Sequence, residues 1–310
     1  MSLNINANHA GKPSGFALWQ LGFRPFFLLA GLSAVWLMGH WLLIYFGHVQ
    51  APYFANPVFW HSHELLFGYT TAVIAGFLLT AVQNWTGLKT VTGRPLMLLA
   101  LLWLAGRLAI ALGDMLPAMV VLIVDMAFLP SVAVAAAIPL LRARHYPNLL
   151  IFISLLTLMT LANLLTHLAH TVIGPLSGTG IQMMFFLILL LIAIMAGRVV
   201  PFFTERGVGG ITLKQSLWLE RLAIVSLAAY ALVVVLQLGT TVSLWLAAIA
   251  LVLNALRWWS WHHPGLWRVP MLWVLHLAYI WLLLSLLFGV LSRLGGVPAV
   301  VEIHAFTVGT

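Results

Sequence analysis

Long apolar runs separated by short polar segments occupy almost the whole chain. The runs cover about 23–46, 60–83, 95–113, 117–141, 149–172, 180–203, 217–238, 242–260 and 270–291. A further run begins near residue 299 and has about 12 residues at Thr310, whereas a membrane crossing needs about 20. The pattern predicts an all-α, polytopic transmembrane helix bundle with nine full helices and a truncated tenth. We expect residues 1–22 to form an N-terminal tail and residues 23–310 to form a single transmembrane domain that is incomplete at its C-terminus.

The composition supports a membrane protein and excludes other classes. Hydrophobic residues make up 63% of the chain and charged residues 6%, against about a quarter charged in soluble domains. So few polar side chains cannot cover a soluble surface, and the excess of apolar residues excludes intrinsic disorder. The chain has no cysteine, which excludes disulfides, thiolate metal sites and the covalent attachment of haem c.

The basic residues predict the orientation of the bundle. With a cytoplasmic N-terminus, 12 of the 14 Lys and Arg residues fall on the inner side and only Arg107 and Arg293 on the outer side. Cytoplasmic loops are enriched in basic residues, so this distribution predicts a cytoplasmic N-terminus. We therefore attribute the formal net charge of +8 to topology in a lipid bilayer and expect no nucleic-acid partner.

Histidines gather at one predicted depth. There are 12 histidines against six acidic residues, and histidine is a costly residue inside a membrane. Seven of them fall at the extracytoplasmic ends of the predicted helices: His40, His48, His61, His63, His167, His170 and His304. A single such residue is most simply a hydrogen-bonded interfacial histidine, but the set of seven predicts a histidine-rich site on that side.

The fifth apolar run carries a polar stripe. Its members are spaced by three, four and three residues, which places them on one helical face: Thr160, Asn163, His167 and His170. Lipid cannot satisfy such a stripe, so it must face the bundle interior or a water-filled cavity. We expect His61, His63, His167 and His170 to share one outer-side pocket, with the nearest imidazoles within about 10 Å of one another.

Two of the acidic residues inside apolar runs are candidates for proton chemistry. Glu64 follows the two histidines of the string WHSHE and shares a helical face with His61 and with small residues that allow close helix packing, while His63 points elsewhere. Glu64 is therefore a candidate either for orienting an imidazole or for carrying a proton. Asp125, within the fourth run, is a second candidate for a proton path.

Neutral imidazole binds copper, zinc and haem iron, and histidines on facing helices suit axial ligation of haem. We expect haem b at this site, with His63 as the first candidate ligand and His167 or His170 as the next. Arg107 and Arg293 are predicted at the same depth and are candidate partners for haem propionates.

Copper has separate candidate ligands. His61 is predicted to lie nearer the water than His63, which suits a copper ligand, and His304 is a second copper candidate in the short tenth run. His276, isolated in the ninth run near the opposite face, is the rival haem ligand.

Several strings together resemble the NnrS family of bacterial membrane proteins. They are GFRPFFLLAG at 22–31, WHSHELLFGYTTAVIAGFLLTAVQNWTG at 60–87, GRPLMLLALLWLAGR at 93–107, GRVVPFFT at 197–204 and HAFTVGT at 304–310. The resemblance implies a bacterial inner-membrane bundle of about twelve helices that contains haem and copper and is linked to nitric oxide and nitrosative stress. The histidine motifs of the family match His61, His63 and His304.

Other functions remain open at the level of the sequence. A transporter for a metal ion or a small solute would use the same histidine cluster as its first binding site. A sensor or assembly factor with structural haem would share the site but catalyse nothing. No residue is assigned a catalytic role, and whether the chain is an enzyme is left open.

Overall fold

The computed structural model describes residues 17–54, 56–171 and 178–310, and the side chains of all of these except residues 170 and 171. These residues form helices joined by short turns, with no strand in the ranges described. Nine helical stretches in these ranges are long and apolar enough to cross a membrane. The predicted all-α, polytopic architecture is therefore confirmed.

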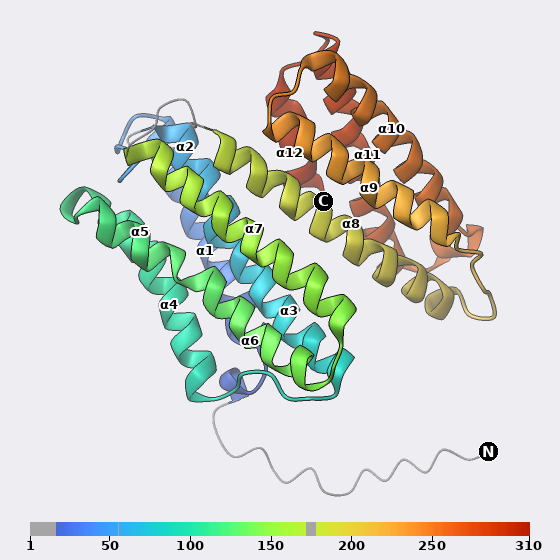
Figure 1. Ribbon diagram of the computed structural model, residues 1–310, viewed down its shortest axis with the longest axis horizontal. Coiled ribbons are helices and arrows are strands. Elements are labelled where there is room, and N and C mark those ends of the chain that lie inside the picture. The colour runs from blue at the N-terminus through green and yellow to red at the C-terminus, as the bar shows by residue number, and fades with distance from the viewer. Residues whose placement is uncertain (1–16, 55, 172–177) are drawn as a thin grey trace, which may run out of the picture. The chain divides into compact units, whose positions relative to one another are not determined.

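The chain divides into two compact units, residues 1–181 and residues 182–310. Unit 1 contains a short 3₁₀ turn at Ala17–Gln20 and then the helices of the first five crossings (Figure 1): α1 (Phe23–Tyr45), α2 (Pro57–His63), a π-helical turn (Glu64–Tyr69), α3 (Thr70–Thr86), α4 (Arg94–Ala111), a 3₁₀ turn (Gly113–Met115), α5 (Ala118–Met126), α6 (Phe128–Arg142) and α7 (Tyr146–Thr171). Helix α3 packs against α1 and α6, α7 packs against α6 and α5, and α4 packs against α5 and α6.

The second crossing is one continuous stretch, Pro57–Thr86, with a π-helical turn inside it. The Asn56 side chain caps its start by accepting a hydrogen bond from the backbone N–H of Phe59. The π-helical turn begins at Glu64, immediately after His63. A π-helical turn holds more residues than an α-helical turn, which brings successive side chains closer in angle. His63 and Glu64 consequently meet, although a regular helix would have placed them on different faces.

The fourth crossing is broken where the sequence predicted a continuous helix. Helix α5 ends at Met126 and α6 begins at Phe128, and Figure 1 shows the two following one another along the chain. Pro130 has no backbone N–H to donate to the carbonyl of Met126, which explains the position of the break. Asp125 therefore lies in the last turn of α5.

Unit 2 contains the residues of α8 (Thr179–Val208) from Gln182 onward, α9 (Leu217–Val235), α10 (Thr240–Trp261), a 3₁₀ turn (Pro264–Arg268), α11 (Pro270–Arg293) and α12 (Ala299–Gly309). Helix α10 packs against both α9 and α11, and α12 packs against α11. Buried ion pairs join these helices: Arg257 to Glu220 at 2.5 Å, and Arg293 to Glu302 at 2.7 Å. A buried charge is stable only when it is paired, so these pairs fix the packing of unit 2.

Candidate metal centre

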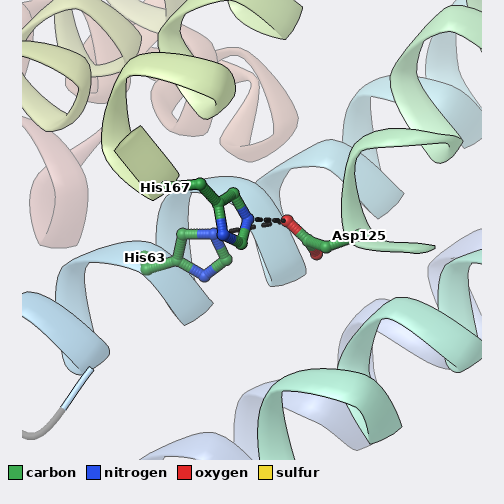
Figure 2. Close-up of side chains that lie close together, drawn as sticks. All are labelled: His63, Asp125 and His167. Carbon is green, nitrogen blue, oxygen red and sulfur yellow. Dashed lines mark hydrogen bonds and ion pairs between the residues drawn. The ribbon is translucent and has the colours of Figure 1, made fainter. Parts of the chain in front are cut away.

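Three buried side chains from three helices of unit 1 converge on one point. His63 lies at the end of α2, Asp125 in the last turn of α5 and His167 in the last turns of α7. Each offers a ligand atom, and these three atoms lie within 4.8 Å of one another. Figure 2 shows the two imidazole rings and the Asp125 carboxylate facing one another. Such a set of donors can hold a metal ion.

Asp125 connects the members of the centre. Its Oδ2 accepts from Nε2 of His167 at 3.0 Å and from Nδ2 of Asn163 at 2.8 Å. The same oxygen lies 3.4 Å from Nε2 of His63. Its Oδ1 pairs with the Arg107 guanidinium. These contacts compensate the buried charge, because an unpaired carboxylate is costly inside a membrane-spanning bundle.

Both ring nitrogens of His63 face acceptors. Nδ1 lies 3.0 Å from Oε1 of Glu64, and Nε2 lies 3.2 Å from Oδ1 of Asn163. The Asn163 oxygen is assigned as the acceptor because the amide nitrogen donates to Asp125. Two donating ring nitrogens define an imidazolium. The positive charges of His63 and Arg107 therefore balance the two carboxylates of the cluster.

Arg107, from α4, pairs with both Glu64 and Asp125. The guanidinium reaches them because Gly68 has no side chain: a Cβ at that position would lie 2.9 Å from Nη1 of Arg107. The carbonyl of Gly68 accepts from the indole N–H of Trp103 at 3.0 Å and from the Thr71 hydroxyl at 3.1 Å. The π-helical turn therefore carries one partner of Arg107, Glu64, and leaves room for its guanidinium at Gly68.

Tyr53, in the segment between α1 and α2, contacts His167 from the other side. The Tyr53 hydroxyl lies 3.0 Å from Nδ1 of His167. Because Nε2 of His167 donates to the Asp125 carboxylate, Nδ1 accepts and the phenol donates. Burial, and after it the negative charge of Asp125, raise the pKa of Tyr53 to about 12. The phenol therefore keeps its proton at neutral pH.

Aromatic rings surround the two imidazoles. The Phe54 ring centroid lies 4.7 Å from that of His63 and 5.8 Å from that of His167. Phe67 stacks on His63 at 5.1 Å. The two imidazole centroids are 5.4 Å apart, so the expectation that His63 and His167 lie within about 10 Å of each other is confirmed.

The other predicted residues of unit 1 have different positions. The His61 ring stacks on Trp41 with 4.2 Å between centroids. The side chain of His170 lies outside the described residues, so its predicted role as a ligand stays a prediction. Glu64 lies beside an imidazole, in the position expected of an orienting partner.

The predicted residues of unit 2 lie in other surroundings. Arg293 donates to Glu302 and to the carbonyl of Gly289. His304 is exposed, with Nδ1 2.9 Å from the carbonyl of Val300. His276 is buried; its Nε2 lies 2.9 Å from the Thr204 hydroxyl, and its Nδ1 has no hydrogen-bond partner.

Sequence reasoning missed two features of the centre. Tyr53 was not a candidate, because it lies between two apolar runs where no periodicity indicates which side chains are buried. Arg107 was expected to pair with a haem propionate, but it pairs with Glu64 and Asp125. The signal for that pairing was present, since the two acids and the arginine are all charged residues inside apolar runs.

The donors suit a transition-metal ion. Two imidazole nitrogens and one carboxylate oxygen bind copper, zinc or iron(II). Each histidine also has a partner on its other ring nitrogen, Glu64 for His63 and Tyr53 for His167, as histidine ligands of metals usually do. The centre does not fit haem, because the side chains of Asn163 and Asp125 occupy the space beyond Nε2 of His63 that a porphyrin would need.

Comparison with known proteins identifies one family. The sequence profile described as "NnrS protein" matches residues 17–310, which is nearly the whole chain and includes every residue of the centre. Searches of curated proteins and of solved structures gave no match.

Proposed function

The chain belongs to the NnrS family, and from that premise we propose that it is a copper- and haem-binding protein of the bacterial inner membrane that takes part in the response to nitric oxide and nitrosative stress. The proposal places a copper ion at His63, Asp125 and His167. The observation that carries it is the convergence of their three ligand atoms within 4.8 Å.

Copper is the metal that these donors favour among the divalent ions of the first row, because affinity for nitrogen and oxygen sites peaks at copper. A copper ion at this point would supply one-electron redox chemistry. Asp125 and the two imidazoles would hold it, and Nε2 of His63 would have to give up its proton to become a ligand.

Two charged residues complete the centre. Arg107 pairs with both carboxylates, which helps Asp125 to remain ionised in a buried position. Glu64 holds Nδ1 of His63 and so directs Nε2 toward Asp125 and His167. The residues that surround the centre are buried, which keeps water away from the ion and strengthens each electrostatic contact.

Haem b requires a different place in the chain. The resemblance implies haem, but the centre in unit 1 has no room for a porphyrin. Of the predicted haem ligands with described side chains, His276 keeps a buried ring nitrogen without a partner. We therefore favour His276 over His63 as the haem ligand.

The proposal is tested by the metal content of the purified full chain. We expect one copper per chain, measured by inductively coupled plasma mass spectrometry. His63→Ala and His167→Ala should each lose most of it, because each removes one of three ligands. His48→Ala is the matched control, since His48 is an exposed histidine in a loop of unit 1. Copper that stays in both ligand variants, or a wild-type chain without copper, would contradict the proposal.

A further inference from the structure

Tyr53 reaches the metal centre from the segment between α1 and α2, outside every helix. The Tyr53 side chain is buried, and its hydroxyl lies 3.0 Å from Nδ1 of His167. The next residue, Phe54, lies against both imidazoles. These two aromatic residues therefore cover the histidines of the centre. Of the two, only Tyr53 carries a polar group that meets a proposed ligand.

The backbone of Tyr53 has a conformation that tyrosine rarely adopts. Its φ angle is 64°, in the left-handed region, which is unfavourable for a residue other than glycine. Such a conformation persists only where surrounding contacts impose it. The contacts that impose it should therefore be identifiable around this residue.

The 3₁₀ turn Gly113–Met115 provides those contacts. The backbone N–H of Tyr53 donates to Oδ1 of Asp114 at 2.9 Å. Gly113 leaves room for the Tyr53 side chain: a Cβ on that glycine would lie 2.5 Å from Cβ of Tyr53 and 2.7 Å from its ring. The turn after α4 thus holds the tyrosine by a hydrogen bond and by its shape.

The Tyr53 hydroxyl suits His167, because Nε2 of that ring would give up its hydrogen bond to Asp125 on binding a metal ion. Without metal, Nε2 of His167 donates to Asp125 and Nδ1 accepts from the Tyr53 hydroxyl. With a metal on Nε2, the ring proton must be on Nδ1, which then donates to the Tyr53 oxygen. A hydroxyl can donate or accept, so the hydrogen bond survives in both states.

We infer that Tyr53 is the positioning residue for His167 in the metal centre, and that Asp114 and Gly113 act through it. The phenol holds the imidazole so that Nε2 faces the point shared with His63 and Asp125. This inference rests on the proposed copper site. It assigns roles to three residues, Tyr53, Asp114 and Gly113, that lie outside the histidine and acid motifs of the chain.

Tyr53→Phe is the first test, made on the purified full chain with copper(II) ions and a competing chelator. We expect affinity to fall about tenfold, the size usual for losing an outer partner of a histidine ligand. The electron paramagnetic resonance spectrum of bound copper(II) should also change, because the imidazole is no longer fixed. Tyr45→Phe removes a hydroxyl from an exposed tyrosine and should leave both readouts unchanged.

A pair of Asp114 variants tests how Tyr53 is held. Asp114→Ala removes the acceptor for the Tyr53 N–H and should reproduce the affinity loss and the spectral change of Tyr53→Phe. Asp114→Asn keeps a carbonyl oxygen in that place and should bind copper(II) like the wild type. Equal losses in the two variants would overturn the role of the hydrogen bond, since they differ in the acceptor but share the loss of charge.

The outcomes separate this inference from the proposed function. A wild-type chain that binds no copper(II) overturns the copper site and with it the role of Tyr53. A wild-type chain that binds copper(II), together with a Tyr53→Phe variant of the same affinity and spectrum, overturns only the role of Tyr53. If Tyr53→Phe does not fold, Asp114→Ala, which leaves the phenol in place, carries the same test.

Discussion

Arg107 shows how single residues keep charge inside this bundle. The guanidinium is largely buried, with a side-chain exposure of 12%, and it pairs with two carboxylates that are buried still further. Removing one member of such a cluster strongly lowers the free energy of unfolding, because the remaining charges stay buried without compensation. The stability of unit 1 should therefore depend strongly on this one side chain.

Arg107→Met should lower the free energy of unfolding by roughly 3–5 kcal/mol, the range measured when a buried ion pair loses one member. Denaturant unfolding of the detergent-solubilised chain measures the loss. Arg94→Met is the control, since Arg94 is exposed at the start of α4 and should change the value by about 0.5 kcal/mol or less. An equal effect of the two substitutions would show that the pairing of Arg107 contributes nothing.

At the scale of elements, two irregular turns bring the centre together. The π-helical turn at Glu64–Tyr69 places Glu64 beside His63. The break between α5 and α6 leaves Asp125 in the last turn of α5. Irregular turns in helices are frequent at functional sites. In this chain both turns lie beside residues of the centre, Glu64 and Asp125.

Pro130→Ala should weaken copper(II) binding about tenfold, the effect expected when a ligand or its support is displaced. Alanine supplies the backbone N–H that proline cannot donate to the carbonyl of Met126, so we expect α5 and α6 to join and Asp125 to shift relative to the histidines. Competition with a chelator measures affinity, and circular dichroism shows that the helices remain. Pro139→Ala, within the same α6, is the control, and an equal loss there would contradict the account.

The sequence predicted the elements better than it predicted their contacts. Run length placed the first crossing at about 23–46, against Phe23–Tyr45 in the structure, because apolar length alone decides a crossing. The spacing of Asn163 and His167 correctly predicted one inward face of α7. The contact between His63 and Glu64 was not predictable in this way, because it depends on a departure from regular helical geometry.

At the scale of the molecule, the distribution of charge predicts the orientation in the membrane. The 12:2 division of basic residues predicts a cytoplasmic N-terminus and a metal centre toward the outer side of unit 1. The chain lacks cysteine, so one cysteine at a time can report the side of each loop. This prediction is independent of the identity of the metal.

Cysteine at Val49, an exposed residue between α1 and α2, should react with an impermeant thiol reagent in intact cells. Cysteine at Lys214, an exposed residue between α8 and α9, should react only after the membrane is permeabilised. The two positions serve as controls for each other. The reverse pattern would invert the orientation and place the centre on the cytoplasmic side.

The most direct test of the central claim counts the imidazoles on the bound ion. Electron paramagnetic resonance of the purified chain, loaded with one copper(II) per chain, resolves the coupling of copper to its nitrogen ligands. We predict coupling to two imidazole nitrogens in the wild type and to one in His63→Ala or His167→Ala that retains copper. Coupling that is the same in the wild type and in both variants would contradict a copper site at His63, Asp125 and His167.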